Sequence, residues 1–205
     1  MPRENARKAA LPKAGVSPSR GRSSPAREAV LEAAVRLFCR DGISATGIEA
    51  ILAESGVARM TVYNQFGSKE GLVAAALEHE GAAWRAWFFA RLAEIPGGPR
   101  ERLIGIFDLL AEWFVRDDYY GCAFMNAVAE HRNRDKALLQ ATLSHKSHII
   151  EQIRALAAAA GMGNPDRVAG QIDLLMDGAI IKSMIKKSPE PAREAKEMAV
   201  ILLGG

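Results

Sequence analysis

The amino-acid sequence predicts an all-α protein, and three observations support this fold class. Gly and Pro concentrate at the ends of segments, whereas Ala, Leu, Ile, Glu and Arg fill the segment interiors. Apolar residues recur at helical spacing, and no stretch of useful length alternates apolar and polar residues as a β-strand does. A chain of 205 residues is long enough for one or two domains with a large core.

The first predicted helix begins near Ser24-Pro25 and ends at Gly42. Serine is a good helix cap, proline is favoured in a first turn, and glycine commonly follows a last turn. The apolar stripe expected to face the core comprises Val30, Leu31, Ala34, Val35 and Phe38.

Two short helices are expected next, joined by a sharp turn at Ser55-Gly56-Val57. The Thr46 hydroxyl is expected to cap the first of them, and Glu49 stands three positions later, which makes a capping box. Gly56 occupies the turn itself, where a positive φ angle is favoured.

The second short helix, residues 58–65, has an outer face that is not needed for the core. Val62 and Phe66 are expected to face inward, and Ser68 is expected to cap the following helix. Two short helices that meet at a tight turn are typical of a helix-turn-helix, whose second helix lies in the DNA major groove. The side chains left to point away from the core are Arg59, Met60, Thr61, Tyr63 and Asn64.

Many residues between positions 30 and 72 stand at fixed spacings. They are Ala33-Ala34, Leu37-Phe38, Gly42, Thr46, Ile51, Gly56-Val57, Thr61-Val62-Tyr63, Phe66, Ser68-Lys69-Glu70 and Leu72. Together they resemble the DNA-binding head of the TetR/AcrR family of bacterial transcriptional regulators. The resemblance covers about a fifth of the chain, and it implies that Tyr63 and Lys69 contact DNA mainly at phosphates. The full set of expected DNA-binding residues is Thr46, Arg59, Met60, Thr61, Tyr63, Asn64 and Lys69.

Four residues depart from the usual residues of that family. Ala58 replaces a frequent capping Ser or Thr, Met60 replaces a frequent Gly, and Asn64-Gln65 replaces an aromatic or histidine pair. These departures leave the expected fold intact, and they leave the operator sequence undefined.

Six further helices are expected after the helix-turn-helix, with Pro and Gly at several boundaries and Asn164-Pro165 capping the helix that begins at residue 165. They span residues 68–95, 100–115, 122–132, 135–160, 165–187 and 189–204. The nine helices then divide into a three-helix DNA-binding head at residues 25–70 and a six-helix ligand-binding and dimerisation bundle at residues 71–205. A basic arm, residues 1–24, precedes them.

The resemblance implies that the last two long helices pair with their two-fold mates in a four-helix dimer interface. The stripe expected to form this interface is Ile172, Leu175, Met176, Ala179 and Ile180. The alternative is that the stripe faces only the core of its own domain. DNA geometry favours a homodimer, because two recognition helices ~34–36 Å apart read a palindromic operator.

Large apolar side chains of the body, together with one histidine, are candidates for an effector pocket. Ligand pockets are mostly apolar and hold a few placed polar groups. A plain hydrophobic core is the alternative interpretation of the same residues. The candidates are Trp84, Phe88, Phe107, Leu110, Phe114, Phe124, Met125 and His145, and they suggest a small apolar or aromatic effector.

Metal binding and catalysis have weaker support in the sequence. His145 and His148 lie one helical turn apart, and His131 follows Glu130, a spacing that can chelate a transition metal. However, the sequence contains no Cys-x-x-Cys pair, no phosphate loop and no suitably spaced pair of carboxylates. We therefore expect no metal, no cofactor and no enzymatic activity. The alternative function is a helical ligand-binding or catalytic protein that retains the head only as a scaffold.

The arm at residues 1–24 carries six basic side chains and one acidic side chain among Pro, Gly and Ser residues. This composition predicts disorder in the free protein, and the arm either adds contacts to DNA or has no role. No apolar stretch follows it, so a secretory signal is not expected, and no segment is long enough to span a bilayer. Cys39 and Cys122 lie far apart, which favours a reduced, cytoplasmic setting.

Together these features predict a ligand-responsive regulator of transcription. We expect a homodimeric repressor that binds a palindromic operator in double-stranded DNA and is released by a small-molecule effector.

Overall fold

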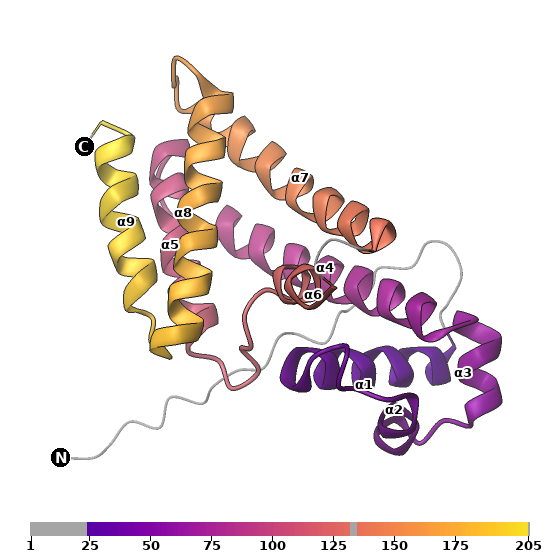
Figure 1. Cartoon of the computed structure of the whole chain (residues 1–205). Helices are drawn as coiled ribbons and strands as arrows, with labels where there is room; N and C mark the ends of the chain where they lie inside the picture. Colours follow the sequence, from indigo (N-terminus) through magenta and orange to yellow (C-terminus); the bar gives the residue numbers. More distant parts are fainter. Residues whose placement is uncertain (1–23, 132–134, 205) are drawn as a thin grey trace. The chain divides into compact units, whose positions relative to one another are not determined.

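The computed structural model describes residues 24–131 and 135–204, which form nine α-helices and no β-strand (Figure 1). The predicted all-α class is confirmed for this part of the chain. Of the predicted arm at residues 1–24, only Ser24 lies within the described residues. None of the described helices combines the length and apolar character needed to cross a bilayer. The helices are α1 (Pro25–Asp41), α2 (Ile48–Ser55), α3 (Arg59–Phe66), α4 (Lys69–Glu94), α5 (Pro99–Phe114), α6 (Ala123–His131), α7 (Lys136–Ala159), α8 (Pro165–Lys186) and α9 (Glu190–Leu202).

Side-chain caps begin three of the helices where the sequence predicts them. Ser24 Oγ accepts a hydrogen bond from the Arg27 amide at 3.2 Å, and Ser68 begins α4 in the same way. Asn164 Oδ1 accepts from the Arg167 amide at 3.0 Å at the start of α8. The first turn of a helix leaves its amides without intrahelical acceptors, so a capping oxygen stabilises the helix start.

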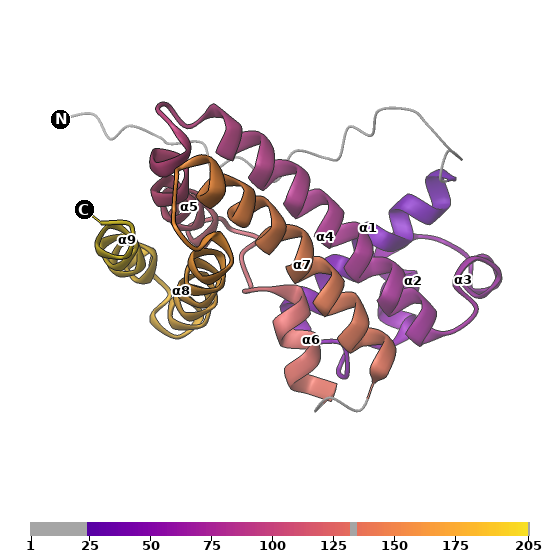
Figure 2. The same cartoon turned by 90° about the horizontal axis from the view of Figure 1, so that it is seen from above.

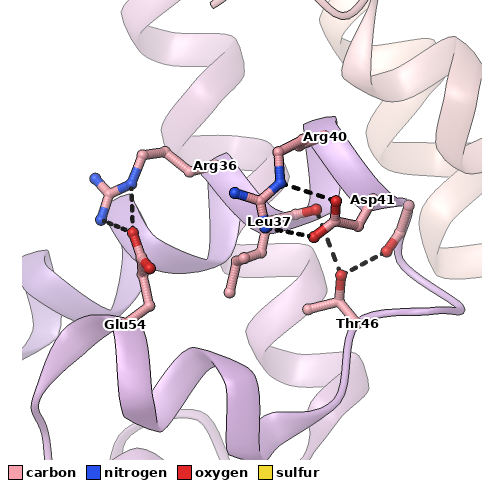
Figure 3. Close-up of polar contacts among 7 residues, drawn as sticks. Arg36, Leu37, Arg40, Asp41, Thr46 and Glu54 are labelled. Atoms are coloured by element: carbon pink, nitrogen blue, oxygen red, sulfur yellow. Dashed lines mark hydrogen bonds and ion pairs between the residues drawn. The ribbon is translucent and has the colours of Figure 1, made fainter.

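The predicted capping box at Thr46 and Glu49 is not formed. Helix α2 begins at Ile48, and the preceding residue, Gly47, has no side chain that could cap it. Thr46 is instead buried, and its hydroxyl donates to the carbonyl oxygen of Gly42 at 2.7 Å (Figure 3). A buried hydroxyl requires such an acceptor, and this bond stabilises the loop between α1 and α2.

The described residues form two compact units, and the first of them contains the helix-turn-helix. This N-terminal unit comprises residues 24–85, 120–131 and 135–151, that is α1, α2, α3, α6 and the first parts of α4 and α7. Helix α1 packs against α2 and α3, and Arg36 of α1 also donates to Glu54 of α2 at 3.2 Å (Figure 3). The buried side chains between these elements include Val30, Leu31, Ala34, Phe38, Ile51, Val62 and Leu72.

The turn between α2 and α3 depends on a glycine, as the sequence predicts. Gly56 follows the last turn of α2 with φ +68°, in the left-handed region where a residue with a Cβ atom is strained. Its amide donates to the carbonyl oxygen of Leu52 at 3.0 Å, which closes α2 and lets the chain turn into α3.

The second unit is built around α5, α8 and α9. This C-terminal unit comprises residues 86–119 and 152–204, and it also includes the last parts of α4 and α7. Helices α8 and α9 run side by side in opposite directions, and α5 packs against both (Figures 1 and 2). The buried face of α9 carries small residues, which allow neighbouring helices to approach closely. These residues are Ala192, Ala195 and Ala199.

Candidate nucleic-acid interface

Helix α3 presents most of its surface to solvent, as the sequence predicts for a recognition helix. Val62 is its one fully buried side chain, with 2% of its surface exposed. Met60 is 68% exposed and Tyr63 is 39% exposed, and Arg59 and Asn64 are also exposed. Residues four apart in a helix lie on the same face, so these four exposed side chains share one surface.

Arg59 forms an ion pair with Glu49 of α2. Both side chains are more than half exposed, so water screens the pair and it contributes little to stability. The guanidinium is therefore easily transferred from Glu49 to a phosphate or a guanine edge, both of which it binds with two hydrogen bonds.

Three other residues of the predicted DNA-binding set are less exposed than those four. Thr61 is half-buried in α3, and Lys69 is half-buried in the first turn of α4. Thr46 is 3% exposed and its hydroxyl is bonded to backbone carbonyl oxygens, so this side chain does not belong to the exposed surface. We correct the predicted set by removing Thr46.

A carboxylate of α6 holds the loop that leads into the helix-turn-helix. Glu130 accepts hydrogen bonds from the amides of Ile43 at 3.1 Å and Ser44 at 2.8 Å. Gly42 precedes these residues with φ +89°, and a Cβ atom there would lie 3.0 Å from Glu130 Oε1. The sequence analysis missed this contact, because residues more than 80 positions apart leave no local pattern.

The apolar candidates for an effector pocket are buried in their units. In the C-terminal unit these are Phe88, Phe107, Leu110 and Phe114; in the N-terminal unit they are Trp84 and Phe124, with Met125 half-buried. Such burial is compatible with a pocket lining and with a plain core, so their role in binding stays a prediction. A small hollow in the N-terminal unit is lined by other residues, among them Phe38, Cys39, Leu77, Ala127 and Glu130.

His145 is buried in the N-terminal unit among aromatic and cationic side chains. Its ring stacks on Phe124, with ring centres 4.1 Å apart and planes 15° apart. Its Nδ1 atom lies 2.9 Å from Nη1 of Arg85, and a guanidinium only donates, so Nδ1 accepts and the proton resides on Nε2. Burial, followed by the nearby Arg85 charge, lowers the pKa of His145 to about 3. Within the described residues, no three His, Cys, Asp or Glu side chains are grouped as a metal site requires.

Acidification is expected to destabilise the protein through His145. Because the folded pKa is lowered to about 3, an unfolded chain binds a proton below pH ~6.5 while the folded chain does not. The stability is therefore present above pH ~6.5 and is lost as the pH falls below it. Between pH 7.5 and pH 5.5, the free energy of unfolding should fall by ~1.4 kcal/mol more than in His145→Gln.

Urea denaturation at the two pH values measures this difference. His148→Gln, on the exposed side of the same helix, is the matched control and should behave as the unmodified chain does. An equal pH dependence in the chain with and without His145 would contradict the expectation.

Most of the predicted dimer stripe on α8 is buried in the protein's own core. Ile172, Met176, Ala179 and Ile180 are each at most 5% exposed, and Leu175 is half-buried. Helix α8 packs on α5 and α9, so the burial of Ile172, Met176, Ala179 and Ile180 fits the own-core alternative, whereas the role of Leu175 stays a prediction.

The exposed apolar side chains of α8 and α9 are different ones. They are Leu174 at 73%, Ile181 at 43% and Ile185 at 78% exposed on α8, and Met198 at 57% and Ile201 at 76% on α9. The α8 residues are spaced seven and four positions apart, so they form a second apolar stripe on that helix. We call these five residues the α8–α9 apolar face.

Comparisons with known proteins agree on one family for the helix-turn-helix. Residues 30–76 match the model of bacterial regulatory proteins of the tetR family. The HTH-type transcriptional regulator YjdC of Escherichia coli (strain K12) is 21% identical over 177 residues, which cover 86% of this chain and 93% of that protein.

Two solved structures extend the likeness over nearly the whole chain. SCO4454, a TetR-family transcriptional regulator from Streptomyces coelicolor, superposes with a TM-score of 0.79 at 26% identity, covering 88% of this chain and 96% of that one. A TetR transcriptional regulator from Chloroflexus aurantiacus superposes with a TM-score of 0.77 at 26% identity, covering 87% and 93% of the two chains.

Proposed function

Because the chain belongs to the TetR family and is a DNA-binding transcriptional regulator rather than an enzyme, we propose that it is a homodimeric, effector-released repressor. The observation that carries this proposal is the exposed face of α3, which Val62 anchors while Arg59, Met60, Tyr63 and Asn64 remain in solvent. A side-chain surface of this kind fits the major groove of DNA.

The proposed DNA contacts divide by their chemistry. Tyr63 and Lys69 bind phosphate oxygens, which fixes the position of the head without reading sequence. Arg59 and Asn64 reach base edges, since arginine pairs with guanine and asparagine with adenine in the major groove. Thr61 and Met60 complete the surface. They make apolar contacts with the methyl groups of thymine bases in the major groove.

The α8–α9 apolar face is proposed to bind the same face of a second copy of this chain. Exposed apolar side chains on two adjacent helices favour association, because removing their surface from water lowers the free energy. A two-fold pairing of this helix hairpin produces a four-helix interface, in which each side chain meets its own symmetry mate or a neighbour of it. The dimer then presents two α3 helices to a palindromic operator.

The effector is proposed to be a small, largely apolar or aromatic molecule that binds in the body, in the cytoplasm. It favours the conformation whose heads do not match successive major grooves, and DNA is released. A near-complete switch requires ~5.5 kcal/mol of difference in effector affinity between the two conformations. The boundary between head and body near residue 70 is part of this proposal.

Replacing Glu130 is expected to loosen the loop between α1 and α2. In Glu130→Gln only one side-chain oxygen remains, so one of the Ile43 and Ser44 amides faces an NH₂ group. An unsatisfied amide costs ~1–3 kcal/mol, so hydrogen exchange at that amide should accelerate about tenfold or more. Operator affinity should fall with it, because this loop leads directly into α2.

Amide exchange measured by NMR and a DNA-binding titration check the Glu130 expectation. Glu112→Gln is the control, since Glu112 of the C-terminal unit makes an exposed ion pair with Arg91 at 3.0 Å. Unchanged protection at both amides of the loop would show that the carboxylate does not hold it.

The direct test of the proposed function uses the DNA immediately upstream of the protein's own gene. Fluorescence anisotropy at fixed salt should give a much higher affinity for this duplex than for a shuffled duplex of equal composition, because non-specific phosphate contacts are common to both. Equal affinities would support the alternative of a helical ligand-binding or catalytic protein that keeps the head only as a scaffold.

A further inference from the structure

A largely buried arginine lies beside His145 in the N-terminal unit. The side chain of Arg85, on α4, is 15% exposed. A guanidinium stays charged at all ordinary pH values, and a buried charge is costly unless an opposite charge or strong hydrogen bonds accompany it. The groups around Arg85 therefore indicate which kind of ligand this guanidinium can bind.

Within the described residues, the two polar contacts of Arg85 compensate its charge only weakly. Toward the interior its Nη1 donates to His145 at 2.9 Å, and the low pKa of that ring keeps it neutral. Toward the surface its Nη2 donates to Glu78 at 3.2 Å, but the Glu78 side chain is 70% exposed. Because water solvates the Glu78 carboxylate, its ion pair with Arg85 contributes little to stability, so a competing carboxylate displaces Glu78 at little cost.

Aromatic side chains lie close to the His145 ring, which Arg85 contacts. The Trp84 and His145 ring centres are 5.9 Å apart, and the Phe124 ring stacks on the same histidine with a centre-to-centre distance of 4.1 Å. Gly81 lies one turn before Arg85 on α4, and a Cβ atom there would come within 2.8 Å of the Phe124 ring and 3.0 Å of His145. Glycine at this position thus lets an aromatic group and a polar ring approach α4 directly.

We propose that the effector of this regulator carries a carboxylate group, which binds the Arg85 guanidinium while its apolar part lies against Trp84 and Phe124. This inference rests on the proposed function, since it names the chemical class of the molecule that releases DNA. A carboxylate pairs with arginine through two parallel charge-assisted hydrogen bonds, which neither His145 nor the solvated Glu78 supplies.

Such binding has a direct route to the DNA-binding head within the same unit. A carboxylate on Arg85 removes the hydrogen bond that holds His145, and His145 is stacked on Phe124 of α6. The same helix carries Glu130, whose carboxylate holds the Ile43 and Ser44 amides at the entrance to the helix-turn-helix. A displacement of α6 therefore changes the support of the DNA-binding surface.

The test measures binding of benzoate and octanoate, each beside its neutral amide, to the full-length protein. Tryptophan fluorescence and the thermal unfolding midpoint report binding without DNA. For at least one pair the carboxylate should bind about tenfold or more tightly than the amide, the effect of one charged hydrogen-bonded contact. Arg85→Gln should bring that ratio close to one, and Arg85→Lys should leave an intermediate ratio because lysine keeps the charge without the two-pronged geometry.

Arg91→Gln is the matched control, since Arg91 lies on the same helix and makes exposed ion pairs with Glu94 and Glu112. This variant should keep the full preference for carboxylates. Equal binding of acids and amides by the unmodified chain, or an undiminished preference in Arg85→Gln, would overturn the proposal. An equal increase in the thermal unfolding midpoint with inorganic phosphate alone would also overturn it, because the site would then bind any anion.

Parallel DNA titrations separate this inference from the function on which it rests. If carboxylates bind through Arg85 but do not release operator DNA, Arg85 forms an anion site that is not the effector site. If neutral compounds release DNA while no carboxylate binds, the proposed function as an effector-released repressor stands, and the proposal of a carboxylate effector is wrong.

Discussion

Replacing Leu174 and Ile185 with Asp in the same chain is expected to yield a monomer whose operator affinity is at least ~100-fold lower. These side chains are 73% and 78% exposed, the second being the most exposed large apolar side chain described. Because a two-fold interface contains each substitution twice, four carboxylates would be desolvated near one another, and like charges there are strongly unfavourable. Each freed subunit would then read only one half of the operator.

Light scattering coupled to size-exclusion chromatography, with anisotropy titrations at fixed salt, measures both parts of this result. The folded subunit should survive, because neither side chain contributes to its core. Leu143→Asp is a suitable control, since Leu143 is 51% exposed on α7 and lies outside the α8–α9 apolar face. If the double variant remains dimeric, the proposed interface is wrong. If it is a monomer that keeps full operator affinity, operator binding does not require a dimer.

The joint replacement of Tyr63 and Asn64 with Ala is expected to lower operator affinity by ~30-fold to ~1,000-fold. Each base contact is worth ~1–3 kcal/mol, and the two-fold dimer loses every contact twice, so a total of ~2–4 kcal/mol is a conservative value. The lost phosphate contact of Tyr63 should also reduce the salt dependence of binding. Stability should change little, because both side chains project from the exposed face of α3.

Affinity for operator and shuffled duplexes at several salt concentrations separates these terms. Tyr120→Ala is the matched control, because Tyr120 is also 39% exposed and lies in the same unit. If the double variant binds the operator as tightly as the unmodified chain does, α3 is not the recognition helix.

Most of the fold and part of the site follow from local sequence patterns. The caps at Ser24, Ser68 and Asn164 appear where the sequence predicts them, because a side-chain oxygen bonds an amide only three residues away. The outward face of α3 was likewise predictable, since the spacing of Val62 and Phe66 fixes which side of a helix remains for DNA. The matched family segment added the expected roles of these outward residues.

Contacts between distant segments were beyond the reach of those patterns. Thr46 looks like a helix cap in sequence, yet burial directs its hydroxyl to the Gly42 carbonyl oxygen. Glu130 bonds amides more than 80 positions away, and the Arg85 to His145 contact spans 60 positions. No periodicity encodes such pairs.

The sequence by itself determined that this is an all-α chain with a helix-turn-helix and an outward-facing recognition helix, because capping and helical spacing are local properties. The tertiary structure alone decided how α8 is used. That helix carries two apolar stripes, Ile172 with Met176 and Leu174 with Ile185, and both satisfy the helical period equally well. Only the packing of α5 and α9 buries the first stripe and leaves the second in solvent, since burial is set by neighbours that arrive from other parts of the chain.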